Sequence, residues 1–304
     1  MNNVRHVVFV TGMNPKPPPA EHLPLLWRCI TGGAQQAGMA AEQLEPLASH
    51  FHLAAWNHIY YGNYADIEID RPWVEHMLRG EGERFCAPEP PRWTVMRTRL
   101  MYALGDLLPW LARVFGDADI LARINDTARY FDDSDGIGAR VRAVVKQTLA
   151  PLVEQGAEII LVGHSLGSVV AYDTLWELSR RDRDSWCCPL LLTLGSPLGM
   201  FYIQHRLLGH AEHGARRYPD NIRRWINIAA SGDVIATDRH LANDFRGMRK
   251  YGLISNIEDV AAGVHSCFGT GEGPNAHRCY GYFFHPLVAG LIADWLCGDD
   301  LQVS

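Results

Sequence analysis

The sequence predicts an α/β protein with a mostly parallel sheet covered by helices on both faces. Apolar, β-branched runs that end in turn signals alternate with amphipathic stretches over most of the chain. The clearest pair is residues 158–162, which have the pattern of a short buried strand, and residues 166–176, which have helical spacing. A length of 304 residues fits one large domain, or a core with a cap.

The sequence between these two elements is Gly163-His164-Ser165-Leu166-Gly167. A strand, a sharp turn and a helix are the context that a G-x-S-x-G elbow requires, and the turn exposes the serine hydroxyl at the carboxyl end of the sheet. Gly163 and Gly167 are then small because a Cβ atom would collide with a neighbouring element. The alternative is a glycine-rich turn with an incidental serine. The two flanks favour Ser165 as a nucleophile.

The other expected elements follow from the same two periodicities. Residues 15–19 contain four prolines and form a stiff loop that is neither helix nor central strand. The aspartates at 132–135 stand where a helix dipole favours carboxylates, at a helix N-terminus. The expected strands are 4–10, 51–60, 189–194 and 225–230, and the expected helices are 23–38, 137–154 and 286–296.

The alternation of strands and helices stops between residues 64 and 129. Short amphipathic pieces are broken there by proline and glycine, and residues 98–115 carry an apolar stripe. We interpret 64–129 as a partly helical cap or lid insertion, and 1–63 with 130–304 as the core. The stripe is more typical of packing between cap and sheet than of a membrane anchor.

Composition limits the partners. A net charge of −6, with basic residues only in short pairs, argues against nucleic acid. Neither a signal peptide nor an apolar run long enough for a membrane span is evident, so we expect a soluble cytoplasmic protein. The seven cysteines are odd in number and contain no C-x-x-C. They predict neither a disulfide framework nor a zinc site, and most of them are expected to be buried small hydrophobic side chains. The oligomeric state cannot be read from the sequence.

Histidines could also suggest a metal site. The candidate ligands form two groups, the first being His50, His52 and His58 and the second His205, His210 and His213. No Asp, Glu or Cys set completes either group, so the sequence predicts no metal and implies no cofactor.

A serine hydroxyl is a weak nucleophile until a base, usually a histidine held by a carboxylate, takes its proton. On a sheet of this kind the chain order is serine, acid, histidine. Asp233 is the preferred acid because it follows the strand at 225–230. The weaker choices lie deeper in the connecting loop, and they are Asp238, Asp244 and Asp259.

Four histidines follow Asp233. His277 lies in a loop shortly before the last helix, from which a side chain can reach back over the sheet, and it is the preferred base. His265 is the second choice. His240 follows the acid too soon, and His285 adjoins Pro286 and marks the start of the helix.

Five segments resemble the α/β-hydrolase superfamily, and most closely its intracellular lipase/esterase-like branch. They are Phe9-Val10-Thr11-Gly12, the elbow at 163–168, Leu194-Gly195-Ser196-Pro197, Asp233-Val234-Ile235 and His277-Arg278-Cys279-Tyr280. The likeness covers the core but not the cap. It departs from the family at Thr11-Gly12, where His-Gly is common. The resemblance implies that the backbone N–H groups of Met13 and Leu166 form an oxyanion hole.

These observations predict a serine hydrolase that cleaves a carboxylic ester or thioester, with Ser165 as nucleophile, His277 as base and Asp233 as its orienting acid. The apolar cap favours a hydrophobic acyl group. An acyltransferase is the closest alternative, because an alcohol and water compete for the same acyl-enzyme. A non-catalytic binding module that keeps the fold is the alternative of another class.

Overall fold

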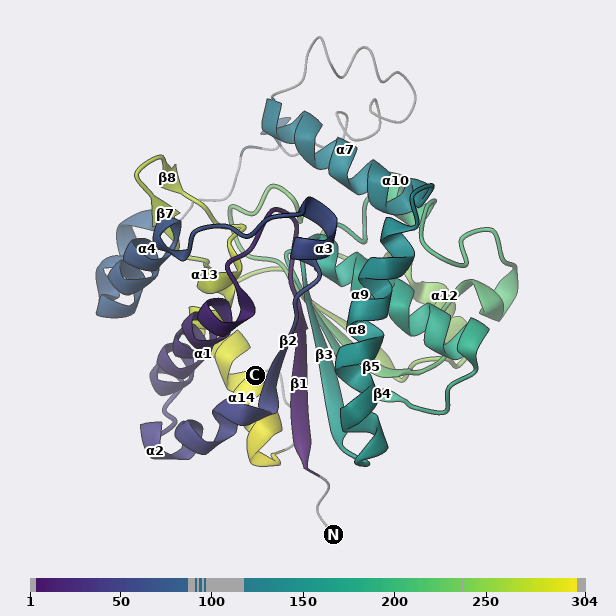
Figure 1. Cartoon of the computed structure of the whole chain (residues 1–304), viewed down its shortest axis with the longest axis horizontal. Helices are drawn as coiled ribbons and strands as arrows, with labels where there is room; N and C mark the ends of the chain where they lie inside the picture. The colour runs from purple at the N-terminus through teal and green to yellow at the C-terminus, as the bar shows by residue number, and fades with distance from the viewer. Residues whose placement is uncertain are drawn as a thin grey trace.

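A computed structural model describes residues 4–86, 91, 93–94, 96, 118–236 and 238–299, without the side chains of residues 83 and 118–124. The described part is built in three layers, with one twisted sheet between two groups of helices (Figure 1). This arrangement buries strand residues on both faces, which explains why the strands are nearly continuous apolar runs.

The sheet has six strands in the order β2-β1-β3-β4-β5-β6, and every neighbouring pair is parallel. The predicted α/β class with a parallel sheet is therefore confirmed. Parallel strands bring their carboxyl ends to one edge, so the loops after β1, β3, β4 and β5 lie together. The strands are β1 (Arg5–Val10), β2 (Phe51–Ala54), β3 (Glu158–His164), β4 (Cys188–Leu194), β5 (Ile222–Ile228) and β6 (Asn256–Val260).

Helices cover the two faces of the sheet (Figure 1). The helices α1 (Pro19–Gln36), α13 (Cys279–Phe284) and α14 (Pro286–Cys297) pack on one face, and α8 (Ile137–Glu154) and α9 (Leu166–Trp176) pack on the other. Alternate residues of β1 enter the two cores: Val7 belongs to the first and Val8 to the second. Both faces of the sheet are thus buried under helices, and the strand ends lie at its two edges.

Further elements connect these layers. They are α2 (Ala41–Leu44), η1 (Glu45–His50), α3 (Asn57–Tyr61), η2 (Ile67–Ile69), α4 (Arg71–His76), η3 (Met77–Glu81), η4 (Glu83–Phe85), α7 (Ala118–Asp132), η5 (Glu177–Asp182), α10 (Phe201–Gln204), η6 (Gly214–Arg217), α11 (Leu241–Asp244), α12 (Arg246–Lys250) and the hairpin of β7 (Gly269–Thr270) and β8 (Gly273–Pro274). In the described part of the chain, no helix combines the length and the hydrophobicity that a membrane crossing requires.

Several elements differ from the sequence prediction, and three of these differences are the largest. The expected strand at 51–60 ends at Ala54, and residues 57–61 form α3. The helix expected at 23–38 begins earlier, because Pro19 at its first position needs no N–H partner there. The connecting loop expected after the strand at 225–230 contains β6, an edge strand whose polar side chains hide its period.

The cap expected at 64–129 is described at its two ends, which are helical. Residues 67–85 form η2 to η4 beside α1, and α7 lies across the carboxyl edge of the sheet (Figure 1). Most of the apolar stripe at 98–115 lies outside the described residues. The cap therefore stays a prediction.

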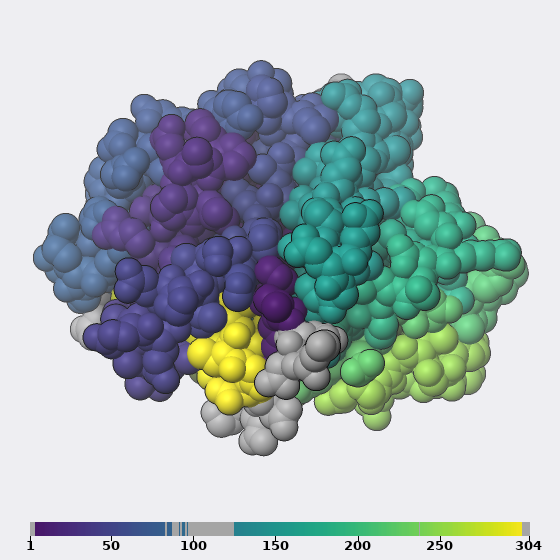
Figure 2. Space-filling view, turned by 60° about the horizontal axis from the view of Figure 1, so that its bottom comes forward, coloured from purple at the N-terminus to yellow at the C-terminus, as the bar shows by residue number. Residues whose placement is uncertain are grey.

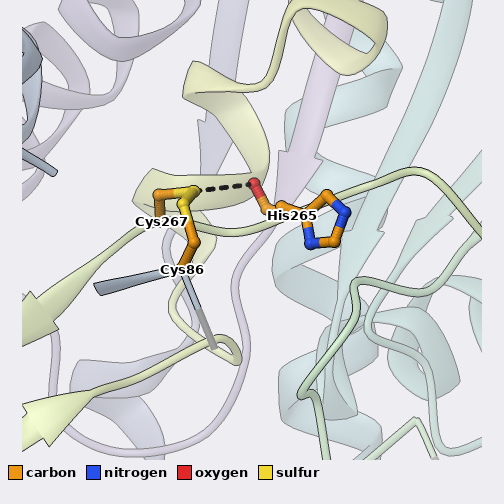
Figure 3. Close-up of a disulfide and its surroundings, with 3 residues drawn as sticks. All are labelled: Cys86, His265 and Cys267. Carbon is orange, nitrogen blue, oxygen red and sulfur yellow. Dashed lines mark hydrogen bonds between the residues drawn. A yellow bond between two sulfur atoms is a disulfide. The ribbon is translucent and has the colours of Figure 1, made fainter. Parts of the chain in front are cut away.

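A disulfide joins Cys86 to Cys267, and the prediction that the cysteines form no such bond is wrong for this pair. Figure 3 shows the bond between the segment after η4 and the loop that precedes β7, with the His265 carbonyl oxygen 3.7 Å from the Cys267 sulfur. A separation of 181 residues hides such a pair from any local spacing rule. Three of the remaining cysteines, Cys29, Cys188 and Cys279, are buried as expected.

The amino edge of the sheet faces away from the loops described above. Figure 2 shows the beginning of β1 at the surface there, between the yellow C-terminal helix α14 and the teal residues of α8. The loops that follow the parallel strands lie at the opposite, carboxyl edge.

Candidate active site

Ser165 occupies a strained turn between β3 and α9. Its φ of 53° and ψ of −131° are unusual for a residue with a side chain. The strain is held by the sheet, since the Ser165 N–H donates to the carbonyl of Leu194 at 3.0 Å. A Cβ atom on Gly163 would lie 2.6 Å from the Ser168 Cα, and one on Gly167 would lie 2.3 Å from the Thr11 carbonyl oxygen. The two glycines are small for the predicted reason.

The structure brings together the three side chains that the sequence singled out. His277 Nε2 lies 2.8 Å from the Ser165 hydroxyl oxygen. Its other nitrogen, Nδ1, lies 2.9 Å from both carboxylate oxygens of Asp233. Ser165 is 4% exposed, and the side chains of His277 and Asp233 are 15% and 0% exposed. The histidine therefore bridges a buried carboxylate and a hydroxyl at the edge of solvent.

The protonation of this chain of hydrogen bonds follows from its partners. Burial alone would raise the pKa of Asp233, but the attraction of His277 and the hydrogen bonds that the carboxylate accepts lower it to about 2. An ionised carboxylate only accepts, so Nδ1 carries the proton. In a neutral imidazole Nε2 then accepts from the Ser165 hydroxyl, which is the direction that makes the serine more nucleophilic.

Asp233 is held by further donors. The Tyr282 hydroxyl donates to its Oδ2 at 2.7 Å, and the Ile235 N–H donates to its Oδ1 at 2.9 Å. Gly195 follows β4 with a φ of +56°, and a Cβ there would lie 2.6 Å from Asp233 Oδ2. A glycine at this position lets the backbone pass close to the carboxylate.

His164, the variable residue of the elbow, holds the loop that carries His277. Its Nε2 donates to the His277 carbonyl oxygen at 2.7 Å, since a carbonyl can only accept. Burial, followed by the nearby His277 and Lys16, keeps the pKa of His164 well below its usual value. A neutral imidazole therefore ties the elbow to the histidine loop.

The turn after β1 lies against the elbow. A Cβ atom on Gly12 would be 2.9 Å from that of Ser165, so no side chain fits between the two loops. Asn57, buried in α3, donates from its amide nitrogen to the carbonyls of Gly12 at 2.7 Å and Asn14 at 2.9 Å, and its amide oxygen accepts from the Thr11 hydroxyl. Met13, between those carbonyls, has its backbone fixed by this side chain.

The expected oxyanion donors both adjoin Ser165. Met13 lines the same pocket as the serine hydroxyl, and Leu166 begins α9, where the first backbone N–H groups have no partner within the helix. Ser168 also stabilises the elbow. Its hydroxyl donates to the Ser165 carbonyl at 2.6 Å and lies 2.7 Å from the Ser196 hydroxyl.

The aspartates and histidines ranked below Asp233 and His277 make other contacts in the structure. Asp259 caps α11 by accepting from the N–H groups of Leu241 and Ala242. Asp238 accepts from the backbone of His240. His285 caps α14, as its position before Pro286 predicted, by accepting from the Leu287 N–H at 3.3 Å. His265 lies beside the disulfide (Figure 3), and Asp244 packs near Gly199.

The two histidine groups considered as metal ligands do not form a site. Among the described residues, no set of three or more histidine, cysteine or acidic side chains is arranged to hold a metal ion. His50 and His52 instead cluster with His6, whose Nδ1 lies 2.9 Å from His52 Nε2. Burial, and then the neighbouring imidazoles, lower the pKa of His6 to about 4.

A pocket of about 120 Å³ opens over the Ser165 hydroxyl. It is lined by three loops: residues 12–14 with Lys16 after β1, residues 164–165 of the elbow, and residues 275 and 277–279. Ser165, His277 and Met13 thus line one pocket. Comparison of the chain with models of known families, with curated proteins and with solved structures finds no match.

Sequence reasoning missed His164, Asn57 and Tyr282. Asn57 fell inside an expected strand, although asparagine is depleted in strands, and that depletion was the available signal. Tyr280, the last residue of the segment that resembles the family, packs its ring against Phe268 and His22 instead. Local sequence spacing did not indicate that the hydroxyl two residues later reaches the carboxylate.

Proposed function

We propose that this chain is a serine hydrolase of the α/β-hydrolase type that cleaves a carboxylic ester or thioester. The observation that carries the proposal is His277, with one ring nitrogen 2.8 Å from the Ser165 hydroxyl and the other 2.9 Å from the Asp233 carboxylate. The strained elbow at Ser165 supports it, because strain of this kind is found where a side chain must be presented to a ligand.

The reaction follows from these atoms. Ser165 Oγ attacks the carbonyl carbon while its proton passes to His277 Nε2, and the Met13 and Leu166 N–H groups stabilise the oxyanion. His277 then gives the proton to the leaving oxygen or sulfur, and an alcohol or thiol departs from an acyl-enzyme. Water attacks this acyl group, gives a proton to His277 and releases the acid, and the proton returns to Ser165.

Labelling with a fluorophosphonate tests the nucleophile without knowledge of the substrate. We expect one label on the wild-type chain, located at Ser165 by peptide mass, and none on Ser165→Ala. Ser134→Ala, which removes an exposed serine before α8, is the matched control and keeps the label. Labelling that persists in Ser165→Ala would overturn the assignment, and absence of any label on the folded wild type would favour a binding module.

The location and the acyl preference stay predictions. The disulfide between Cys86 and Cys267 weighs against the expected cytoplasmic location, because disulfides persist mainly in oxidising compartments. The expected hydrophobic acyl group depends on the cap stripe, which lies largely outside the described residues. Product analysis with an added alcohol separates hydrolysis, which releases free acid, from acyl transfer, which releases a new ester.

A further inference from the structure

The pocket over Ser165 has a charge opposite to that of the whole protein. The chain carries a net charge of −6, yet the described pocket lining contains two cationic side chains, Lys16 and Arg278, and no carboxylate. A single-sign lining at a recess concentrates ligands of the opposite charge. Asn14 and Asn275 add polar side chains to the lining, and Met13 and Cys279 add apolar ones.

The backbone of Lys16 is restricted at the edge of the pocket. Lys16 lies between Pro15 and Pro17, whose rings restrict the chain on both sides, and its carbonyl accepts from the Ala65 N–H at 3.0 Å. The residue is half-buried at the rim of the turn that contains Met13. The backbone that carries this side chain beside the pocket is therefore restricted before a ligand binds.

The Arg278 guanidinium is held by an ion pair with a carboxylate outside the pocket. It directly follows His277, and its guanidinium pairs with Asp70 at 3.0 Å, a carboxylate that is 10% exposed and does not line the pocket. A guanidinium has five N–H donors, so it can bind Asp70 and an anion at the same time. The ion pair with Asp70 orients the guanidinium without placing a negative charge in the pocket.

The two cations act at a common place. Both lie close enough to His22 and to Cys279 to lower the pKa of each of these buried groups, whose own burial is the largest influence. Cys279 also lines the pocket. Lys16 and Arg278 thus both line the pocket that contains Ser165, and the fields of both reach the same two buried groups.

We propose that the substrate of this site carries an anionic group, a carboxylate or a phosphate, that Lys16 and Arg278 bind beside the scissile bond. This inference rests on the proposed hydrolase function and defines its substrate class. The anion can belong to the acyl half or to the leaving group, and matched esters distinguish the two.

The test compares esters that differ only in charge. Mono-p-nitrophenyl succinate places a carboxylate in the acyl half, and its methyl ester is the neutral isostere. The butyrate ester of 4-hydroxybenzoate places the carboxylate in the leaving group. Its neutral counterpart is the methyl ester of the same compound, methyl 4-(butyryloxy)benzoate. We expect wild-type kcat/KM to favour the anionic member of one pair, by about tenfold or more for a charge-assisted contact.

Lys16→Met should reduce that preference about tenfold, and Lys16→Arg should restore it. Arg278→Gln should act in the same direction, and pairing it with Asp70→Asn avoids a buried unpaired carboxylate. Lys250→Met, on α12, is the matched control and keeps the preference. Inhibition of neutral-ester hydrolysis by succinate and by inorganic phosphate shows which anion is preferred.

Each outcome decides a different claim. Suppose that in both pairs the neutral ester is hydrolysed with a kcat/KM equal to or higher than that of the anionic ester, and that Lys16→Met leaves this ratio unchanged. The anionic substrate is then wrong, while the proposed hydrolase function is supported. If none of the esters is hydrolysed and Ser165 takes no fluorophosphonate, the proposed function fails and this inference fails with it. A preference that disappears in Lys16→Met and returns in Lys16→Arg supports both.

Discussion

The Tyr282 hydroxyl donates to Asp233 Oδ2 at 2.7 Å and accepts from the Ala230 N–H at 2.9 Å. One phenol thereby connects the end of β5, where the candidate acid stands, to α13, which follows the candidate base. The contact adds to those that hold the pKa of Asp233 down to about 2, against the opposing effect of its burial. Tyr282 is thus a positioning residue for the acid.

Replacing Tyr282 with Phe removes this donor and leaves the Ala230 N–H without its partner. We expect the free energy of unfolding to fall by about 1–3 kcal/mol and kcat for an activated ester to fall about tenfold, with a smaller change in KM. Loss of this donor should also raise the pKa of Asp233, so the pH at which kcat falls on the acid side should move upward. Tyr280→Phe, in the same helix but packed on Phe268, controls for the loss of a buried phenol and should keep the pH profile.

The sequence predicts the centre of this site better than its supports. Ser165, Asp233 and His277 could be selected because each stands at the end of a strand or before the last helix, and parallel strands bring such positions to one edge. The order along the chain left four histidines open, and the loop position of His277 together with the resemblance to the α/β-hydrolase superfamily favoured it. The distances that join the three residues are geometric findings of the structure.

The supports could not be selected, because they depend on contacts between elements far apart in the chain. Asn57 reaches the turn after β1 only because β2 ends at Ala54 and the chain turns into a helix. The disulfide joins residues separated by 181 positions. Neither fact has a periodic signature, and the polar edge strand β6 has only a weak one.

Alanine substitution of three histidines tests the base. His277→Ala should lower kcat nearly as much as Ser165→Ala, and the double variant should be no worse than either, because nucleophile and base act as a unit. His265→Ala and His285→Ala are the controls, since neither lies within the described pocket. Near wild-type turnover of His277→Ala, with a collapse of one of the others at an unchanged melting temperature, would show that the base is misassigned.

Asn57→Ala tests whether the turn that contains Met13 must be held. Loss of the two hydrogen bonds to Gly12 and Asn14 should lower kcat by about tenfold or more, since misplacing one oxyanion donor costs about 10²–10³ in known cases. KM for a short ester should change little. Asn227→Ala, which removes a buried asparagine of β5 whose amide donates to Asp259 and accepts from Thr193, controls for the general cost of losing buried hydrogen bonds. Equal losses of stability with a loss of kcat only in Asn57→Ala support the role.

Acid should destabilise the fold through its buried histidines. Burial, and then neighbouring charges, lower the pKa of His6 to about 4 and of His22 to about 3. Unfolded histidines bind protons below a pKa of about 6.5, whereas these two do not until the lower values are reached. The unfolded state therefore binds more protons as the pH falls from about 6.5 to about 4, and stability falls by about 1.4 kcal/mol per pH unit for each group.

Urea unfolding at pH 7.5, 6 and 5 measures this slope. It should be nearly flat for these groups above pH 7, and it should be shallower in His52→Gln, which removes the imidazole 2.9 Å from His6. His213→Gln, in the loop before η6, is the control and should keep the slope. An unchanged slope in His52→Gln would mean that the cluster contributes nothing to the acid sensitivity.

The disulfide between Cys86 and Cys267 ties the start of the expected cap to the loop ahead of the candidate base. Closing a loop of this length restricts the unfolded chain, and loss of such a bond typically costs about 2–5 kcal/mol. Dithiothreitol should therefore lower the melting temperature of the wild type. The Cys86→Ser/Cys267→Ser variant should melt lower from the outset and no longer respond to the reductant, whereas Cys187→Ser/Cys297→Ser, which removes two exposed thiols, should behave as the wild type. If reductant lowers the melting temperature of the Cys86→Ser/Cys267→Ser variant as much as that of the wild type, its effect does not act through this bond.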